Sequence, residues 1–403
     1  MNTKWDTRLL GDILEPTETL DPQRAPNSEF EYIDVSSVSN KTFRIEQTQT
    51  LKGRDAPSRA RRRVKANDVL FATVRPTLSR IALVPNELDN QICSTGYFVL
   101  RPRPGICARF LFYFLLTEEF NARMEQLQKG ASYPAVTDRD VRSQPISFPE
   151  SAEQRRIVGL LDKAFAAIAT AKANTEKNLQ NARALFTSRL ESVFAANGRA
   201  WPSKPLADLT SKIGSGATPL GGEKVYQQHG VPFIRSLNVH DEGFRHERLA
   251  FLRESQAADL DNVTVKPGDV LLNITGASIA RSCLVPENLT PARVSQHVSI
   301  VRPIPEKLDS EFLHYLLISR PYKTQLLQAG EGAGATRQAL TKAGIERFRI
   351  EVPPRVEEQR SVASQLREFA DATRRLESMG KRKLDALDGL KCSLLNAAFV
   401  GAL

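Results

Sequence analysis

The 403-residue chain contains one long internal repeat. VKANDVL begins at Val64, and VKPGDVL begins at Val265, 201 positions later. The same offset relates VLRP at 99–102 to IVRP at 300–303, and it has drifted to 205 where the two EQR segments begin, at Glu153 and Glu358. Order is kept throughout, and the drift is what loops of unequal length would produce. Because each copy is about 200 residues long, the repeat predicts two related domains and excludes an array of short solenoid units.

Each copy changes character once along its length. Residues 1–150 combine short β-branched runs, Pro and Gly punctuation and one amphipathic helix, which is typical of an α+β domain. The pattern over 151–197 is helical, with apolar or small residues near a heptad spacing. The second copy repeats this order, so we expect an α+β domain over 198–355 and a long C-terminal helix over 356–403.

The apolar stripes of the two helices predict that the helices pair. Each stripe is longer than one α+β domain would cover, so an antiparallel coiled coil is expected, with the globular domains separated by the helices and related by a pseudo-twofold axis. The alternative is that each helix folds back on its own domain. The side chains expected to pair the helices are Ile157, Leu161, Ile168, Leu185, Val362, Leu366, Phe369, Leu376, Leu387 and Leu394.

Composition and motifs argue against several protein classes. The four cysteines form no C-x-x-C pair, which disfavours a disulfide framework and a zinc knuckle. No stretch approaches 18 apolar residues, and the N-terminal segment lacks the apolar run of a signal peptide, so a cytoplasmic protein without a membrane partner is expected.

The sequence lacks several common catalytic signatures. There is no G-x-x-x-x-G-K-[ST] loop and no H-E-x-x-H pattern, and GEGAGA at 330–335 lacks the Lys-Ser/Thr ending of a phosphate loop. We therefore expect no catalytic residue, no metal ligand and no cofactor bound by this chain. A nuclease cluster of carboxylates and a lysine stays open as an alternative.

The charge balance favours a polyanionic partner. The chain carries 56 Lys plus Arg against 46 Asp plus Glu, for a net charge of +10. The most basic run is LKGRDAPSRARRRVKAND, beginning at Leu51, and phosphate contact is its functional interpretation, with a solvated loop as the alternative. Its candidate DNA-binding residues are Lys52, Arg54, Arg59, Arg61, Arg62, Arg63 and Lys65.

Polar segments supply further candidates for DNA contact in both copies. In the first copy these are Arg75, Thr77, Arg80, Ser132 and Tyr133. In the second copy, RSLNVHDE, NITGASIARS and GATRQ are rich in the residue types that read base edges, although each could equally be a capped turn. The candidates there are Arg235, Asn238, His240, Asn273, Thr275, Ser278, Arg281, Thr336, Arg337 and Gln338.

Over essentially its whole length, the chain resembles the specificity subunit of type I restriction-modification enzymes. The resemblance is carried by the order of domains and helices, and by the segment from Trp201 that ends in GSGATP, VPFIRSLNV from Val231, VKPGDVLLNITG from Val265 and the PP and EQR of 353–360. The first copy departs from this pattern: FPESAEQRR replaces the double proline, and FATVRP stands where LNITG does.

This resemblance implies a division of labour between subunits. Each α+β domain would be a target recognition domain that reads one half of a bipartite double-stranded DNA site, and the helices would set the spacer and dock two methylation subunits. S-adenosylmethionine, ATP and Mg would belong to partner subunits, which could include two restriction subunits. The alternatives are a DNA-binding adaptor of another modification or defence enzyme, and a self-dimerising nuclease.

Overall fold

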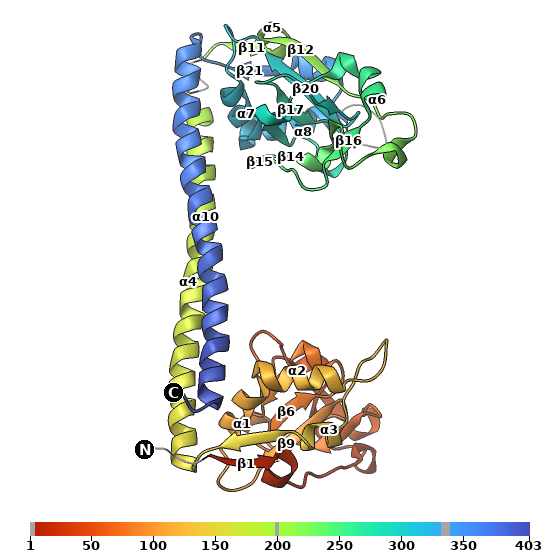
Figure 1. Ribbon diagram of the computed structural model, residues 1–403, viewed down its shortest axis with the longest axis vertical. Helices are drawn as coiled ribbons and strands as arrows, with labels where there is room; N and C mark the ends of the chain where they lie inside the picture. The colour runs from red at the N-terminus through yellow and green to blue at the C-terminus, as the bar shows by residue number, and fades with distance from the viewer. Residues whose placement is uncertain (1–4, 198–200, 332–338) are drawn as a thin grey trace. The chain divides into compact units, whose positions relative to one another are not determined.

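The computed structural model describes residues 5–197, 201–331 and 339–403. The chain divides into two compact units, one formed by residues 1–176 and 381–403 and the other by residues 177–380. Both units combine strands and helices, and each contains one end of both long helices, α4 (Ser151–Asn197) and α10 (Val356–Phe399) (Figure 1). The predicted α+β class with two long helices is confirmed.

The first unit is built on two four-stranded sheets. In the antiparallel sheet the order is β2 (Leu14–Glu15), β9 (Tyr97–Pro102), β6 (Val69–Ala72) and β7 (Ile81–Leu83). The mixed sheet, in which β3 and β8 are parallel, has the order β4 (Gln49–Lys52), β3 (Glu29–Ile33), β8 (Ile92–Ser94) and β5 (Ala60–Arg63). The remaining elements are β1 (Asp6–Leu9), paired with β10 (Pro145–Phe148), and the helices α1 (Ala108–Leu115), α2 (Glu118–Leu127) and α3 (Asp138–Arg142).

The second unit repeats this topology with one strand fewer in its mixed sheet. Its antiparallel sheet has the order β12 (Thr210–Ser215), β20 (Val298–Pro303), β17 (Val270–Asn273) and β18 (Ser282–Leu284). Its mixed sheet has the order β16 (Ala250–Leu252), β13 (Val231–Ile234) and β19 (Arg293–Val294). The other elements are β11 (Ser203–Pro205) paired with β21 (Arg349–Glu351), β14 (Val239–His240) paired with β15 (Gly243–Phe244), α5 (Leu206–Leu209), α6 (Glu254–Ala258), α7 (Ser310–Ile318), α8 (Arg320–Glu331) and α9 (Lys342–Arg347). Strands β6, β7 and β9 each recur 201 residues later, as β17, β18 and β20.

The repeated VK-x-x-D phrase forms a tight turn in both copies. Its second variable position has a positive φ, +69° at Asn67 and +83° at Gly268, which Asn and Gly tolerate best. The backbone N–H of the lysine donates to the aspartate carboxylate, at 2.8 Å for Asp68 and 2.7 Å for Asp269. The turn therefore places a buried aspartate immediately before each central strand.

Each of these aspartates binds an arginine of the neighbouring strand. Asp68 accepts hydrogen bonds from Nε and Nη2 of Arg101, at 2.9 and 2.7 Å. Asp269 accepts the same pair of bonds from Arg302, at 2.6 and 2.7 Å. A bidentate guanidinium–carboxylate contact fixes both distance and orientation. The repeated phrase is thus a structural device that locks β6 to β9 and β17 to β20.

The repeated EQR segment has an equivalent role at the start of each long helix. The Gln154 side chain accepts from the N–H of Cys107 at 2.8 Å and donates to the carbonyl of Pro149 at 2.8 Å. Gln359 makes the corresponding two bonds in the second unit, at 2.8 and 2.9 Å. Both glutamines are buried, so each satisfies backbone groups that would otherwise be unpaired and ties the helix to its own domain.

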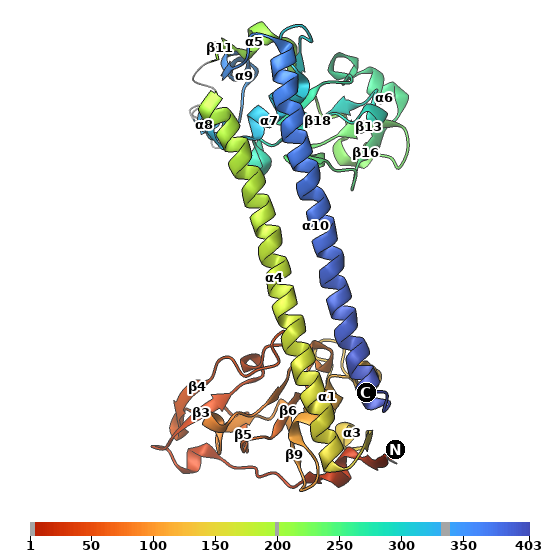
Figure 2. The same ribbon diagram turned by 90° about the vertical axis from the view of Figure 1, so that its left-hand side faces the viewer.

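Helices α4 and α10 pair antiparallel in both units. In the first unit Lys172 forms an ion pair with Asp388. In the second unit Arg183 Nε lies 2.5 Å from Glu377 Oε1, so residue numbers rise along α4 as they fall along α10. Both views show the two helices side by side (Figures 1 and 2). The predicted antiparallel pairing is confirmed.

Most of the side chains expected to pair the helices are covered, but three of them are exposed. Ile157, Leu161, Ile168 and Leu366 are buried, and Val362, Leu387 and Leu394 are half-buried. By contrast, Leu185, Phe369 and Leu376 are exposed. The covered face of each helix is one position further along the chain and uses Phe186, Ala370 and Glu377. The apolar stripe predicted from the sequence is one residue too early at these three positions.

Candidate nucleic-acid interface

The arginine triplet of the basic run lies on β5, where each guanidinium is already paired. Arg61, Arg62 and Arg63 are half-buried. In order, their carboxylate partners are Asp21, Asp138 and Glu18, at 2.9, 2.8 and 3.0 Å. These contacts hold β5 to segments far away in the sequence and neutralise much of the charge that the sequence suggested was free.

The remaining cations of the run are more accessible. Arg59 and Lys65 are exposed, and within the described ranges neither makes an ion pair. Lys52 and Arg54 are exposed too, with only long contacts, 3.8 Å to Glu29 and 3.6 Å to the adjacent carboxylate. Exposed, weakly paired cations can neutralise phosphates at little cost in protein contacts. Of the predicted phosphate-contacting residues, these four are the best placed.

The loops that follow β6 and β17 share a backbone but not side chains. Positive φ values occur at equivalent positions, +51° at Arg75 and +75° at Gly276, then +49° at Ser79 and +64° at Ala280. FATVRPTLSR and LNITGASIAR therefore share left-handed residues at two equivalent positions, although their 3-10 turns, Pro76–Leu78 and Gly276–Ser278, begin one residue apart at the offset of 201. Similar backbones that carry different polar groups are suited to reading different partners in the two copies.

In the first unit this loop presents a cation against an aromatic ring. The guanidinium carbon of Arg75 lies 5.2 Å from the ring centroid of Tyr133, which is 72% exposed. The N–H of Arg75 donates to the carbonyl of Pro134 at 2.7 Å, which holds the two loops together. Thr77 and Ser132 are exposed beside them in the sequence. An exposed Arg–Tyr pair can contact phosphate through the guanidinium and a base through either planar group.

Arg80 is placed differently from the other candidates. Its Nη1 donates to the carbonyls of Val35, Ser36 and Val38, at 3.2, 3.2 and 2.7 Å. Because one guanidinium nitrogen closes the loop after β3, Arg80 supports the frame of the domain. These three contacts leave the other two guanidinium nitrogens unused.

In the second unit the equivalent loop borders a small surface cavity of about 400 Å³. Thr275, Ser278 and Arg281 line this cavity together with His297. The Thr275 hydroxyl and His297 Nδ1 are 2.6 Å apart, which brings one hydroxyl, one imidazole and one guanidinium to the same surface. Such converging donors and acceptors match the pattern of a base edge. His297 was not among the residues predicted from the sequence, because it belongs to no recognisable motif. The sequence signal for it is its position directly before β20, where the first copy has Gly96.

Four of the predicted DNA-binding residues of the second unit make hydrogen bonds or ion pairs within their own domain. Two of them, Asn238 and Asn273, are buried. The amide of Asn238 donates to the carbonyl of Arg245 at 2.9 Å, and that of Asn273 donates to the carbonyl of Ser236, also at 2.9 Å. These asparagines close loops, as the alternative of capped turns suggested.

Arg235 and His240 also make internal contacts. Arg235 pairs with Glu223 at 3.1 Å, and its guanidinium lies 5.1 Å from the ring centroid of Tyr226. His240 Nε2 is 3.0 Å from the carbonyl oxygen of Leu237. The last three candidates, Thr336, Arg337 and Gln338, lie outside the described residues.

The described residues include buried cysteines but no cluster of metal-binding side chains. Among them, no group of three or more His, Cys, Asp or Glu side chains could hold a metal ion. Burial raises the pKa of Cys93 and of Cys283 to about 12, so both stay thiols at neutral pH and are poor nucleophiles. No helix in the described part of the chain has the length and apolar character needed to cross a membrane.

Fold and surface together define a class of protein: one chain that holds two copies of an α+β scaffold, each with its own set of polar side chains on the same loop. A family model described as the type I restriction modification DNA specificity domain matches residues 2–181 and 198–384. The chain belongs to this family.

Named relatives and solved structures agree with this assignment. The type I restriction enzyme HindI specificity subunit of Haemophilus influenzae is 23% identical over 87% of this chain and 90% of its own length. A putative type I restriction enzyme MjaX specificity subunit of Methanocaldococcus jannaschii is 19% identical over 98% and 93%. A chain from a structure of the assembly and conformational transition of the type I R-M system matches with a TM-score of 0.83 and 28% identity, covering 99% and 98% of the two chains. The HsdS subunit from Thermoanaerobacter tengcongensis matches with a TM-score of 0.69 and 28% identity, over 100% and 98%.

Proposed function

We propose that the chain is the DNA sequence-specificity subunit of a type I restriction-modification complex. Each unit carries one target recognition domain, at 1–150 and 198–355, and each domain reads one half of a bipartite double-stranded site. The observation that carries this proposal is the pair of loops after β6 and β17, which share positive φ angles at equivalent positions and differ in side chains. Two readers on one scaffold are what two different half-sites require.

The long helices, 151–197 and 356–403, set the spacer and dock two methylation subunits. Their support is an apolar surface that the helix pair leaves uncovered: Leu185, Phe369, Leu376 and Met379 are exposed in the second unit, and Leu160 and Leu390 in the first. These exposed apolar side chains on two charged helices supply contacts that a docking subunit would bury. The chain itself is non-catalytic and cytoplasmic; S-adenosylmethionine, ATP and Mg serve the partner subunits, which include restriction subunits where these join.

A domain exchange tests the proposal. Residues 1–150 are replaced with the first domain of another family member, the chimera is produced with its methylation subunits, and methylated adenines are mapped in the host DNA. One half of the site should change, while the other half and the spacer stay the same. The reciprocal exchange of residues 198–355 is the matched control and should alter only the opposite half. A single exchange that alters both halves would contradict modular reading.

A further inference from the structure

Arg281 of the second unit and Arg80 of the first are equivalent residues, each at the end of the loop that follows the central strand. The N–H of Ala72 donates to the carbonyl of Arg80 at 3.0 Å. In the same way, the N–H of Asn273 donates to the carbonyl of Arg281 at 2.8 Å. Because both loops close with the same backbone bond, the two arginine side chains leave the backbone at equivalent positions.

The two arginine side chains nevertheless have different partners. Arg80 is bound to its own domain, because its Nη1 donates to three carbonyls, among them that of Val35 at 3.2 Å. The guanidinium of Arg281 makes no hydrogen bond or ion pair with any residue that the structure describes, and it lines the surface cavity of about 400 Å³. Its N–H donors are therefore unused within the described part of the domain.

An asparagine of the second unit makes the bond that Arg80 makes in the first. The Asn273 amide donates to the carbonyl of Ser236 at 2.9 Å. Ser236 stands 201 residues after Val35, whose carbonyl accepts from Arg80. The first unit has Ala72 at the position of Asn273, and its methyl group cannot donate. Because the asparagine closes this loop, the second unit does not need its arginine for that purpose.

A second exchange brings an imidazole to the same surface. His297 and Gly96 are equivalent: the carbonyl of each accepts from the residue that follows the central strand, at 3.0 and 2.8 Å. A Cβ on Gly96 would lie 2.5 Å from a methyl carbon of Val35, so the first unit has no room for a side chain there. The second unit has the smaller Ser236 in place of Val35, and both Ser236 and His297 line the cavity.

The imidazole of His297 is held on one side and accessible on the other. Its Nδ1 is 2.6 Å from the hydroxyl of Thr275. Its Nε2 has one long contact, 3.3 Å to the amide nitrogen of the exposed Gln296. The ring is itself exposed. The contact with Thr275 therefore orients a ring that still has an edge for another partner.

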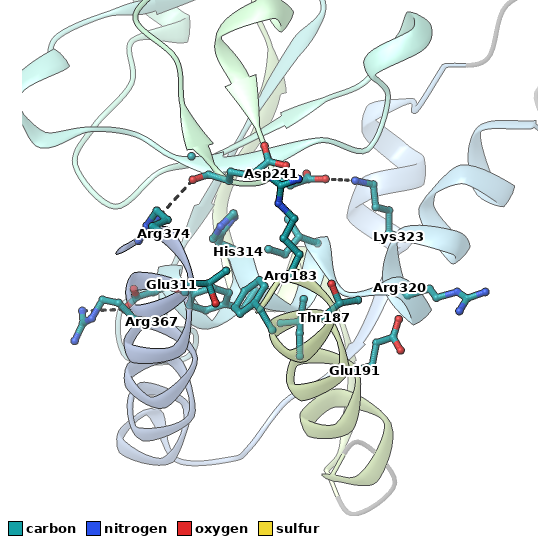
Figure 3. Close-up of a pocket in the computed structure, with 18 of the residues that line it drawn as sticks. Arg183, Thr187, Glu191, Asp241, Glu311, His314, Arg320, Lys323, Arg367 and Arg374 are labelled. Atoms are coloured by element: carbon teal, nitrogen blue, oxygen red, sulfur yellow. Dashed lines mark hydrogen bonds and ion pairs between the residues drawn. The ribbon is translucent and has the colours of Figure 1, made fainter. Parts of the chain in front are cut away.

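The end of the loop next to Arg281 is anchored to a helix. The N–H of Ser282 donates to the carboxylate of Asp241 at 3.1 Å, and the same carboxylate pairs with Lys323 of α8 (Figure 3). This anchor fixes the backbone from which the guanidinium of Arg281 extends. A fixed backbone reduces the conformational entropy that is lost when the side chain binds a partner.

We propose that Arg281 and His297 are specificity-determining residues of the second recognition domain, an inference that rests on the proposed function. Arg281 donates two parallel N–H bonds to O6 and N7 of a guanine, whose major-groove edge presents these two acceptors side by side. His297 lines the same cavity and contacts the neighbouring base pair. The first domain reads DNA by other residues, because Arg80 is held within that domain and Gly96 has no side chain.

Rates of adenine methylation test the proposal, with the full chain assembled with its methylation subunits. The half-site that the exchange of residues 198–355 assigns to the second domain should contain a guanine. In Arg281→Ala, discrimination against other base pairs at that one position should fall about tenfold or more. Arg281→Lys should have a similar effect, because lysine keeps the charge but lacks the planar pair of donors.

Contact with phosphate would give a different result. If Arg281→Ala slows methylation of all sites equally and Arg281→Lys restores it, Arg281 contacts the DNA backbone and the proposal fails. A second half-site without guanine would also overturn it. Arg253→Ala is the matched control: it removes one exposed arginine of the same domain that does not line the cavity, and discrimination should be unaltered.

The contribution of the imidazole is tested separately. His297→Gly copies the first domain and should relax discrimination at the base pair next to the guanine, with little change in Tm because the ring is exposed. Unaltered discrimination at every position would remove His297 from the reading surface. If the exchange of residues 198–355 alters neither half-site, the proposed function itself fails. If that exchange alters one half-site and the Arg281 variants do not, only this inference fails.

Discussion

At the scale of single residues, the buried aspartate before each central strand is the residue whose loss should destabilise its domain most clearly. Asp269 is fully buried, and its only charged partner among the described residues is Arg302. Replacing it, as Asp269→Asn, leaves a guanidinium without its counter-charge. We expect the free energy of unfolding to fall by about 3 kcal/mol, measured by urea titration of circular dichroism.

An exposed ion pair provides the control for this prediction. Asp6 and Arg8 are 2.7 Å apart and about half exposed. Asp6→Asn should cost less than about 1 kcal/mol, because solvent screens the pair. Equal destabilisation in the two variants would show that burial does not make the Asp269 interaction special.

Within the basic run, the structure reduces the number of residues expected to contact phosphate. Arg59 and Lys65 are exposed without an ion pair in the described ranges, whereas Arg62 is half-buried against Asp138. The double variant Arg59→Ala/Lys65→Ala should reduce the slope of log K against log salt by about 0.9 for each phosphate that the protein no longer neutralises. Fluorescence anisotropy with duplex DNA at several salt concentrations measures it. An unaltered slope would place both side chains in solvent.

Arg62→Ala is the informative comparison for that measurement. It removes one positive charge, as each of the other substitutions does, but it also breaks the ion pair with Asp138. We expect a lower Tm with a smaller change in salt slope.

At the scale of elements, the packing between α4 and α10 is close enough to depend on one glycine. A Cβ built on Gly380 would lie 2.6 Å from Leu179 Cδ2, whereas one built on Gly389 would have no atom within 4 Å. Gly389→Ala should raise stability by about 1 kcal/mol through helix propensity alone. Gly380→Ala should forfeit that gain and lower Tm, because Leu179 must move.

A double variant checks the cause. Leu179→Ala removes the obstructing side chain, so Gly380→Ala should be less harmful in that background than in the parent chain. Thermal unfolding of the four chains gives the coupling directly. Additive effects would mean that Leu179 does not determine the cost.

The order of domains and long helices was predictable from the sequence, because the motifs that indicate it are short and occur twice. The turn before β6 and β17, and the glutamine at the start of each long helix, are short motifs whose repetition indicated the domain order. The functional surface was less predictable. Arg62 and Asp138 are 76 positions apart, so no local pattern reveals that they pair. Asn273 looks like a base reader in sequence and is instead a buried loop closure.

The predicted register of the long helices was wrong at three positions for a related reason. Leu185, Phe369 and Leu376 are larger and more apolar than Phe186, Ala370 and Glu377 as a group, so hydrophobicity alone selects the wrong stripe. Glu377 lies on the covered face because it pairs with Arg183, and Gly380 lies there because the two helices approach closely. Phe186 and Ala370 are covered because they pack against the core of the second domain. The apolar side chains that lie outside the contact between the two helices are exposed and accessible to another protein.

At the scale of the whole molecule, the proposed function makes the DNA spacer depend on helix length. Deleting Ala173–Leu179 from α4 and Lys381–Leu387 from α10 removes one heptad from each helix. It keeps both the Lys172–Asp388 and the Arg183–Glu377 ion pairs. Each helix shortens by about 10 Å, which corresponds to about three base pairs at 3.4 Å per pair. We expect the methylated site to keep both half-sites and to have about three fewer unread base pairs, as measured by mapping methylated adenines.

The control is a chain in which the same two heptads are replaced by different heptads of equal length; its spacer should not change. Deletion of the α4 heptad alone should behave differently from the paired deletion, because it removes the partner of an α10 segment that remains and puts Arg183 out of register with Glu377. That variant should lose stability and methylation together. If instead the paired deletion leaves the spacer intact, the helices do not set it, and the distance between half-sites must be determined by the partner subunits.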